Sequence, residues 1–294
     1  MGFSSMDDLV NEITTNGKFI RSDWNKITGA AAYTAGRWYD FSGLNGTPIA
    51  NAWAGTALAW RSCDETTGNG TQIFGIQHGG NVSTDTKHVL NVSAVTGVAT
   101  GVPAQLMLVD LQGYWPGIST ASATLQTLTG TPTLRYTNGA GCRLFWVQTT
   151  AAGATAHNIS LSYSNTTPTS GRSLPVTVAM TASAIVGHIS HSGTAANNYG
   201  PFLPLASGDT GVSNVASVTF SASSGAGAGA LCLARPLLTL PLTTASVSAE
   251  RDLLNQLPSL PRIMDGACLT WLYFAGAATA ANTNFYGAVE FGWG

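Results

Sequence analysis

Two histidines three residues apart, His188 and His191, are the best candidates in the sequence for metal ligands. On a strand, side chains three residues apart point to opposite faces of the sheet, so this pair could not chelate one ion there. In a loop both imidazoles could reach one ion, but a third ligand is then needed, and the next acidic residue downstream is Asp209. We therefore interpret the pair as loop or half-buried histidines and expect no bound metal.

Two other groups of ionisable side chains have simple interpretations. Asp64 and Glu65 are adjacent in a turn-like segment, whereas glycosidase chemistry needs two acids that converge on a cleft. We expect both acids to be solvated or to cap a helix. His78, with Asp85 and His88 nearby, is a weaker candidate for metal ligands, because the polar loop 79–87 is more simply interpreted as a solvated turn.

Asp110 interrupts the apolar run 106–111 and is the most unusual charge in the sequence. A carboxylate inside an apolar strand needs a partner, because its burial without one is costly. Arg135 and Arg143 are among the few arginines that could supply that partner. We predict a structural ion pair here in preference to a catalytic acid.

The familiar catalytic motifs are missing from the sequence. It has no Gly-x-Ser-x-Gly elbow and no phosphate-binding loop of the Walker type. The glycine-alanine segment 225–230 superficially matches a dinucleotide fingerprint, but Pro236 breaks the segment that would have to be a helix. The sequence therefore predicts a protein that is not an enzyme, with no catalytic residues and no cofactor.

Aromatic residues gather in the first sixty positions. They are Trp24, Trp38, Tyr39, Phe41, Trp53 and Trp60. An exposed row of such rings would form a stacking platform for sugars, whereas Trp and Tyr also anchor contacts between proteins. We favour packing of an extended N-terminal arm against a partner. Trp24, Trp38 and Tyr39 are therefore candidate contacts with other subunits or with a larger assembly.

Charge is scarce throughout the 294-residue chain. It has 12 basic and 14 acidic residues, or 9% charged residues, where soluble globular proteins have about 25%. The net charge of −2 argues against a protein that binds nucleic acid through phosphate contacts. A soluble monomer normally keeps a charged surface, so this composition favours a structural protein that is part of an assembly.

The first residues have the pattern of a short amphipathic helix. Met6, Leu9, Val10 and Ile13 have the spacing of one apolar stripe. Ser4 or Ser5 can cap the helix, and Asn16-Gly17 can end it. A helix this short must dock its stripe on its own body or on another subunit, so the four apolar residues are also candidate contacts.

The rest of the sequence has short strand patterns separated by turns, which predicts an all-β protein of the β-sandwich or jelly-roll kind. Residues 105–111, 142–148 and 269–274 are apolar on both faces and are typical of central strands between two layers. One further short helix is predicted at 248–257. We divide the chain into an N-terminal arm, 1–48, and two β-subdomains, 49–130 and 131–294.

Two features of the sequence bear on the cellular compartment: the cysteines, and the absence of signal-peptide and membrane-spanning patterns. The four cysteines, Cys63, Cys142, Cys232 and Cys268, are far apart and are expected to be small buried hydrophobes in reduced form. The N-terminus lacks the basic and apolar regions of a signal peptide, and no stretch of about 20 predominantly apolar residues is present. We expect no membrane association.

The opening of the chain resembles a known group of proteins. Residues 23–48 read DWNKITGAAAYTAGRWYDFSGLNGTP, and the chain starts MGFSSMDDL. These segments are similar to the opening of virion structural proteins of tailed bacteriophages, and the Gly/Ala/Thr/Ser-rich body is similar to capsid decoration (cement) proteins. The resemblance implies a β-rich fold, a homo-oligomer with a trimer favoured, and a place on the outside of a shell of major capsid protein, after synthesis in the host cytoplasm.

The sequence thus predicts a phage virion protein that binds and stabilises the assembled capsid shell. The alternatives are a tail or fibre component, the major capsid subunit itself, and a glycan-binding β-module. A fibre usually shows a fixed repeat, which is absent from the sequence. The shell subunit is disfavoured because the chain lacks the long charged helix of that family.

Overall fold

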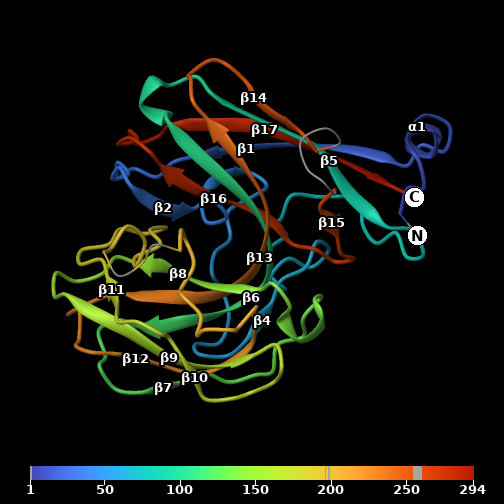
Figure 1. Cartoon of the computed structure of the whole chain (residues 1–294). Coiled ribbons are helices and arrows are strands. Elements are labelled where there is room, and N and C mark those ends of the chain that lie inside the picture. The colour runs from blue at the N-terminus through green and yellow to red at the C-terminus, as the bar shows by residue number, and fades with distance from the viewer. Residues whose placement is uncertain (1, 196, 198, 254–259) are drawn as a thin grey trace.

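The computed structural model describes residues 2–195, 197, 199–253 and 260–294. Within these ranges it has one completely described α-helix, α1 (Met6–Thr14), and three antiparallel sheets (Figure 1). The all-β, sandwich-like fold class predicted from the sequence is confirmed. No helix in the described ranges is long and apolar enough to cross a membrane.

Each sheet contains strands that are distant in sequence. The terminal sheet has the order β14-β5-β17-β1-β3, with β15 paired to β5: β1 (Phe19–Ile27), β3 (Asn45–Thr47), β5 (Lys87–Thr96), β14 (Ala249–Asp252), β15 (Arg262–Ile263) and β17 (Asn284–Trp293). The central sheet has the order β2-β16-β6-β13-β8, with β4 paired to β6: β2 (Arg37–Asp40), β4 (Arg61–Ser62), β6 (Ala104–Ser119), β8 (Arg143–Thr150), β13 (Ala228–Leu242) and β16 (Leu269–Ala275). The serine sheet has the order β10-β9-β12-β7, with β11 paired to β9: β7 (Gln126–Thr127), β9 (His157–Asn165), β10 (Arg172–Ser173), β11 (Val178–Met180) and β12 (Val212–Phe220).

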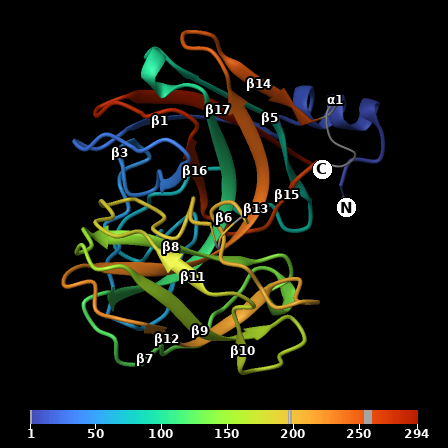
Figure 2. The same ribbon diagram turned by 60° about the vertical axis from the view of Figure 1, so that its left-hand side comes forward.

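The central sheet connects the other two. Its long antiparallel pair, β6 and β13, extends from the terminal sheet to the serine sheet (Figures 1 and 2). The register of this pair shifts at three places, between Gly229 and Leu231, Leu233 and Ala234, and Pro236 and Leu238. Such irregularities bend a strand, so one pair can follow two packing surfaces. The runs 105–111 and 269–274 lie in β6 and β16, inside the sheet order, as predicted. The run 142–148 falls mostly on β8, which is the last strand of that order, although residues 144–148 are buried.

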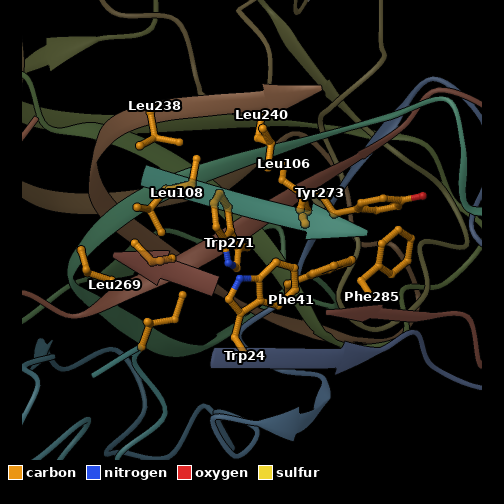
Figure 3. Close-up of a cluster of buried hydrophobic side chains, with 14 of the residues drawn as sticks. Trp24, Phe41, Leu106, Leu108, Leu238, Leu240, Leu269, Trp271, Tyr273 and Phe285 are labelled. Carbon is orange, nitrogen blue, oxygen red and sulfur yellow. The ribbon is translucent and has the colours of Figure 1, made fainter. Parts of the chain in front are cut away.

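A first core fills the space between the central and terminal sheets. It joins apolar side chains of β6, β13 and β16 to those of β1, β5 and β17 (Figure 3). A second core joins the other half of β6 and β13, and β8, to β9 and β12 of the serine sheet. A third cluster lies on the face of the central sheet opposite to the first core. On β6 it contains Val109 and Leu111, whereas the first core contains Leu106 and Leu108. Loop residues such as Phe74 and Ile189 cover it. All four cysteines are buried and unpaired by disulfides, as expected from their apolar surroundings.

The helix predicted at 248–257 is partly wrong. Residues 249–252 form β14, which pairs with β5 in the terminal sheet, because cross-strand pairing there outweighs the helical spacing of the leucines. Leu253 is fully buried in the first core. The remaining residues of the predicted helix, 254–257, lie outside the described ranges.

The predicted arm, 1–48, contributes α1 and three strands to the fold. β1 pairs along its whole length with β17, and β2 pairs with β16, so the start of the chain is paired with its end. Both termini lie beside α1 (Figures 1 and 2). The boundaries proposed at residues 48 and 130 stay a prediction.

Candidate functional site

The N-terminal helix α1 is fixed to the body by one edge of its apolar stripe. The Ser5 side chain accepts a hydrogen bond from the Asp8 backbone N–H at 3.1 Å, which confirms a predicted cap. Leu9 is 4% exposed, and the Ile13 side chain lies beside Gly292 near the end of β17. Lys18, just after the helix, pairs with Glu12 of α1 and with Asp85 of the body, each at 2.8 Å. These contacts hold α1 in a defined position on the surface of the protein.

The other edge of the stripe faces away from the body. Met6 is 57% exposed and Val10 is 51% exposed. Residues four apart lie one turn apart on the same face of a helix, so these two side chains form a small continuous apolar strip. Of the four predicted contacts in the helix, Met6 and Val10 are the ones whose side chains are largely accessible to a partner.

The aromatic contact candidates are core residues of the chain itself. Trp24 is 2% exposed and packs on Trp271 with ring centroids 5.4 Å apart; Figure 3 shows the two indole nitrogens facing one another. Trp38 is 6% exposed and packs on Phe274. The alternation of β1 turns Trp24 inward, whereas both faces of β2 are covered, so Trp38 is buried as well. The expectation that Trp24, Trp38 and Tyr39 meet another subunit is therefore corrected in favour of internal packing.

Tyr39 lies at the centre of an aromatic stack. Its ring is parallel to that of Tyr33 at 3.8 Å between centroids, and the His188 ring stacks with it at 5.0 Å. The Tyr39 hydroxyl accepts a hydrogen bond from the Thr34 backbone N–H at 2.7 Å. Tyr39 is 1% exposed, so its side chain also packs inside the protein.

The ion pair predicted for Asp110 is present, with Arg135 as the partner. Arg135 donates to both carboxylate oxygens, Nε to Oδ2 at 3.1 Å and Nη2 to Oδ1 at 2.5 Å. The Cys268 backbone N–H also donates to Oδ1, at 3.1 Å. Arg135 in addition donates to the carbonyls of Cys63 and Leu111, both at 2.7 Å. All the polar atoms of the pair are used in holding loops to β6, which indicates a structural role.

A second buried network corrects two expectations. Glu65 was expected to be solvated or to cap a helix, and the loop 79–87 next to His78 was expected to be a solvated turn. Glu65 and His78 are instead 2% and 1% exposed, and Lys87 at the end of that loop is buried too. The Glu65 carboxylate accepts from the backbone N–H groups of His78, at 2.5 Å, and Gly80, at 2.9 Å. Lys87 Nζ lies 3.1 Å from His78 Nδ1 and donates to the Gly80 carbonyl at 2.7 Å. Desolvation lowers the pKa of both His78 and Lys87.

This network was missed because its members are separated in sequence and their local context is polar. Only the pairing of β5 with β15 and β17 carries Lys87 into the interior beside the loop that holds Glu65. Asp64, the neighbour of Glu65, is half-buried and caps a turn in place of the expected helix: its carboxylate accepts from the backbone N–H groups of Thr66 and Thr67 at 2.8 and 2.7 Å. The network's groups bond to one another and to backbone, so they stabilise the fold of the loop.

The two candidate metal ligands are buried but do not form a metal site. Burial lowers the pKa of His188 to about 3 and that of His191 to about 4, so both imidazoles are neutral at pH 7. His191 Nε2 lies 2.9 Å from the Pro201 carbonyl. Across the described residues, no group of three or more His, Cys, Asp or Glu side chains is arranged to hold a metal ion.

The serine sheet has an outer face almost without charge. Its outward side chains are exposed or half-exposed hydroxyls on β9 and β12: Ser160, Ser162, Ser164, Ser217 and Thr219. Residues 91–249 contain six charged side chains, and four of them are used in the ion pairs Asp110–Arg135 and Asp209–Arg172. A fifth, Arg235, lies over the Tyr136 ring at 4.5 Å.

Comparisons with known proteins do not assign the chain to a family. No family model matches the chain, and no curated protein matches it. Among solved structures, the chain described as "Structure of infectious bursal disease virus Gt strain" is 9% identical, with a TM-score of 0.17 over 94% of this chain and 81% of that one. The chain described as "Crystal structure of infectious bursal disease virus VP2 subviral particle" is also 9% identical, with a TM-score of 0.16 over 93% and 80%. TM-scores this low do not identify a shared fold.

Proposed function

We propose that the chain is a virion structural protein that binds the assembled capsid shell of a tailed phage and reinforces it, as a decoration (cement) protein without catalytic activity. The observation that carries the proposal is the low charge content of the chain, together with the nearly uncharged outer face of the serine sheet. Of the 26 charged residues, Lys26, Asp40, Glu65, Lys87 and Asp110 are buried, and the serine sheet presents hydroxyls in place of charges. A free monomer normally needs surface charge for solubility, whereas a subunit in a lattice does not.

The contact with the shell is assigned to the strip formed by Met6 and Val10. It is apolar and exposed, and α1 holds it in a fixed position on the body. A preformed contact loses little conformational entropy on binding. The serine sheet, at the other end of the molecule from α1 (Figure 1), is assigned to contacts between copies, with a trimer favoured.

Stabilisation of the shell would arise by mass action. A protein that binds the assembled shell and not its free subunits shifts the equilibrium toward the assembly. Many copies linked to one another also raise the effective concentration of each contact, so no single contact needs to be strong.

The first test is the solution mass of the purified full chain, measured by light scattering over a range of protein concentrations. A trimer or larger closed ring is expected. A monomer at every concentration would contradict the part of the proposal that concerns contacts between copies.

A further inference from the structure

We propose that Cys63 and Cys268 form a disulfide when the folded chain meets a small-molecule disulfide as oxidant. In the structure both thiols are free and fully buried. The inference concerns a site of covalent modification, and it does not rest on the proposed place in a virus particle.

The two cysteines lie next to each other along one edge of β6. Cys63 directly follows β4, and its backbone N–H donates to the Gln112 carbonyl at 3.0 Å. Cys268 directly precedes β16, and its carbonyl accepts from the Leu111 backbone N–H at 2.9 Å. Because Leu111 and Gln112 are consecutive in β6, about one residue step separates the two cysteines along this edge. A disulfide needs Cα atoms within about 7 Å of each other, and this arrangement meets that condition.

Hydrogen bonds hold both backbones in this position. The Cys268 N–H donates to the Asp110 carboxylate at 3.1 Å, and Arg135, the ion-pair partner of Asp110, donates to the Cys63 carbonyl at 2.7 Å. The chain that leaves Cys63 also returns to the start of β16, where the Ile76 N–H donates to the carbonyl of the first residue of that strand at 2.8 Å. The two cysteines are therefore brought together by the fold without any bond between their sulfur atoms.

The two side chains also face one another. Both belong to the third cluster, so they lie on the same face of the central sheet. The Cys63 side chain is in hydrogen-bonding contact with that of Cys268. Gly75 packs against the Cys268 sulfur, so close that a Cβ there would lie 3.1 Å from it. The loop that begins at Cys63 thus covers the sulfur of Cys268.

The other two cysteines are placed differently. Cys232 belongs to the same cluster, but it lies on β13, which pairs with the opposite edge of β6 from β4 and β16. Two strands on either side of a third are about 9.5 Å apart, which is too far for a disulfide. Cys142 belongs to the second core. Cys63 and Cys268 are therefore the pair that the fold selects.

The reaction consists of two thiol–disulfide exchanges. Burial, together with the contact with Cys268, raises the pKa of Cys63, so its thiol is protonated and unreactive until the segment around it opens. After opening, the Cys63 thiolate attacks one sulfur of oxidised glutathione and displaces one glutathione thiolate. The Cys268 thiolate then attacks the Cys63 sulfur and displaces the second. The two cysteines lose two electrons, the glutathione disulfide is reduced to two thiols, and the two cysteine protons pass to the displaced thiolates.

The new bond would join β4 to β16 across a long stretch of chain. A covalent link that closes a long loop reduces the entropy of the unfolded chain, and this effect increases with loop length. The oxidised protein is therefore expected to unfold at a higher urea concentration than the reduced protein.

The test treats the folded full chain with oxidised glutathione and follows it by intact mass and by peptide mapping after digestion at acid pH, where thiols do not exchange. We expect a loss of two hydrogen atoms and one cross-linked peptide pair that contains Cys63 and Cys268. A thiol reagent in urea should detect four thiols before oxidation and two after it, because two of the four cysteines are then joined. The urea midpoint should rise on oxidation and return to its first value on reduction.

Cys232→Ala is the matched control, because it removes a buried thiol of the same cluster and should leave the cross-link unchanged. Cys268→Ala should stop the reaction at a glutathione adduct on Cys63. The proposal is overturned if the wild type forms no disulfide, keeps glutathione on Cys63, or forms a cross-link that includes Cys142 or Cys232. An oxidised protein that unfolds at the same or a lower urea concentration would equally overturn the stabilising bond. Because the wild-type peptide map decides on its own, a variant that fails to fold does not prevent the decision.

Discussion

Arg135 and Asp110, 25 residues apart in the chain, form a two-bond ion pair between a loop and the middle of the longest strand. The Asp110 side chain is fully buried and that of Arg135 is 14% exposed. The pair and its bonds to Cys63, Leu111 and Cys268 hold together four segments: β6, the Arg135 loop, and the segments that contain Cys63 and Cys268.

The first prediction follows from this pair. Arg135→Met leaves the Asp110 carboxylate buried without its charged partner, and breaking a buried pair in this way costs about 3–5 kcal/mol. The free energy of unfolding, measured by urea denaturation at pH 7, should fall by that amount. Arg172→Met, at the more exposed pair with Asp209, is the control and should lower the free energy of unfolding by clearly less than Arg135→Met does. Equal losses in the two variants would contradict a structural role specific to Asp110.

The second prediction concerns acid. In the unfolded chain a histidine has a pKa near 6.5, whereas the folded-state pKa values of His188 and His191 are about 3 and about 4. Between these limits the unfolded state binds more protons, so stability should be complete above pH 6.5 and fall as the pH is lowered toward 4. The slope approaches about 1.4 kcal/mol per pH unit for each histidine.

Burial raises the pKa of Asp40 and opposes this trend, but Asp40 is one group, whereas desolvation also lowers the pKa of His78 and His88 and so adds to the effect of His188 and His191. The check is urea denaturation at intervals from pH 7.5 to pH 5. His191→Gln should have a shallower dependence on pH than the wild type. A stability that stays constant or rises over this range would show that the two imidazoles are not desolvated.

The third prediction concerns the exposed strip of α1. Replacing Met6 and Val10 together by serine removes apolar surface that the shell contact would bury, worth about 2–4 kcal/mol. Shell binding should weaken roughly 30-fold or more, while the melting temperature stays unchanged. Val247→Ser is the control, because Val247 is 58% exposed and lies outside α1. If the double variant and the control bind shells alike, the strip is not the contact.

The fourth prediction concerns the serine sheet. Ser160→Lys places a charge on its outer face, and oligomer symmetry would repeat that charge in every copy. The monomer should keep its stability within about 0.5 kcal/mol, whereas the oligomer should dissociate. Ser160→Ala, which adds no charge, should assemble normally. An unchanged solution mass for Ser160→Lys would exclude this face from contacts between copies.

Much of the fold was predictable from local patterns. The two-sided apolar runs of β6, β8 and β16 require cover on both faces, and the stripe and cap of α1 specify a short helix. β14 was not predictable in this way, because its residues have helical spacing and their pairing with β5 depends on a strand more than 150 residues away.

The candidate sites were less predictable than the fold. The pairing of Asp110 with an arginine follows from the cost of a lone buried charge, and the structure selects Arg135 from the two candidates. The inward direction of Trp24 and Trp38 could not be decided, since aromatic residues serve cores and interfaces equally well.

The central claim is that the chain binds an assembled shell and stabilises it. The most direct measurement is co-sedimentation of the purified chain with capsid shells that lack it, alongside free major capsid subunits, followed by thermal disruption of the loaded shells. We predict saturable binding to shells at a fixed copy number, no binding to free subunits, and a higher disruption temperature. Absence of binding to shells, or equal binding to shells and free subunits, would contradict the account.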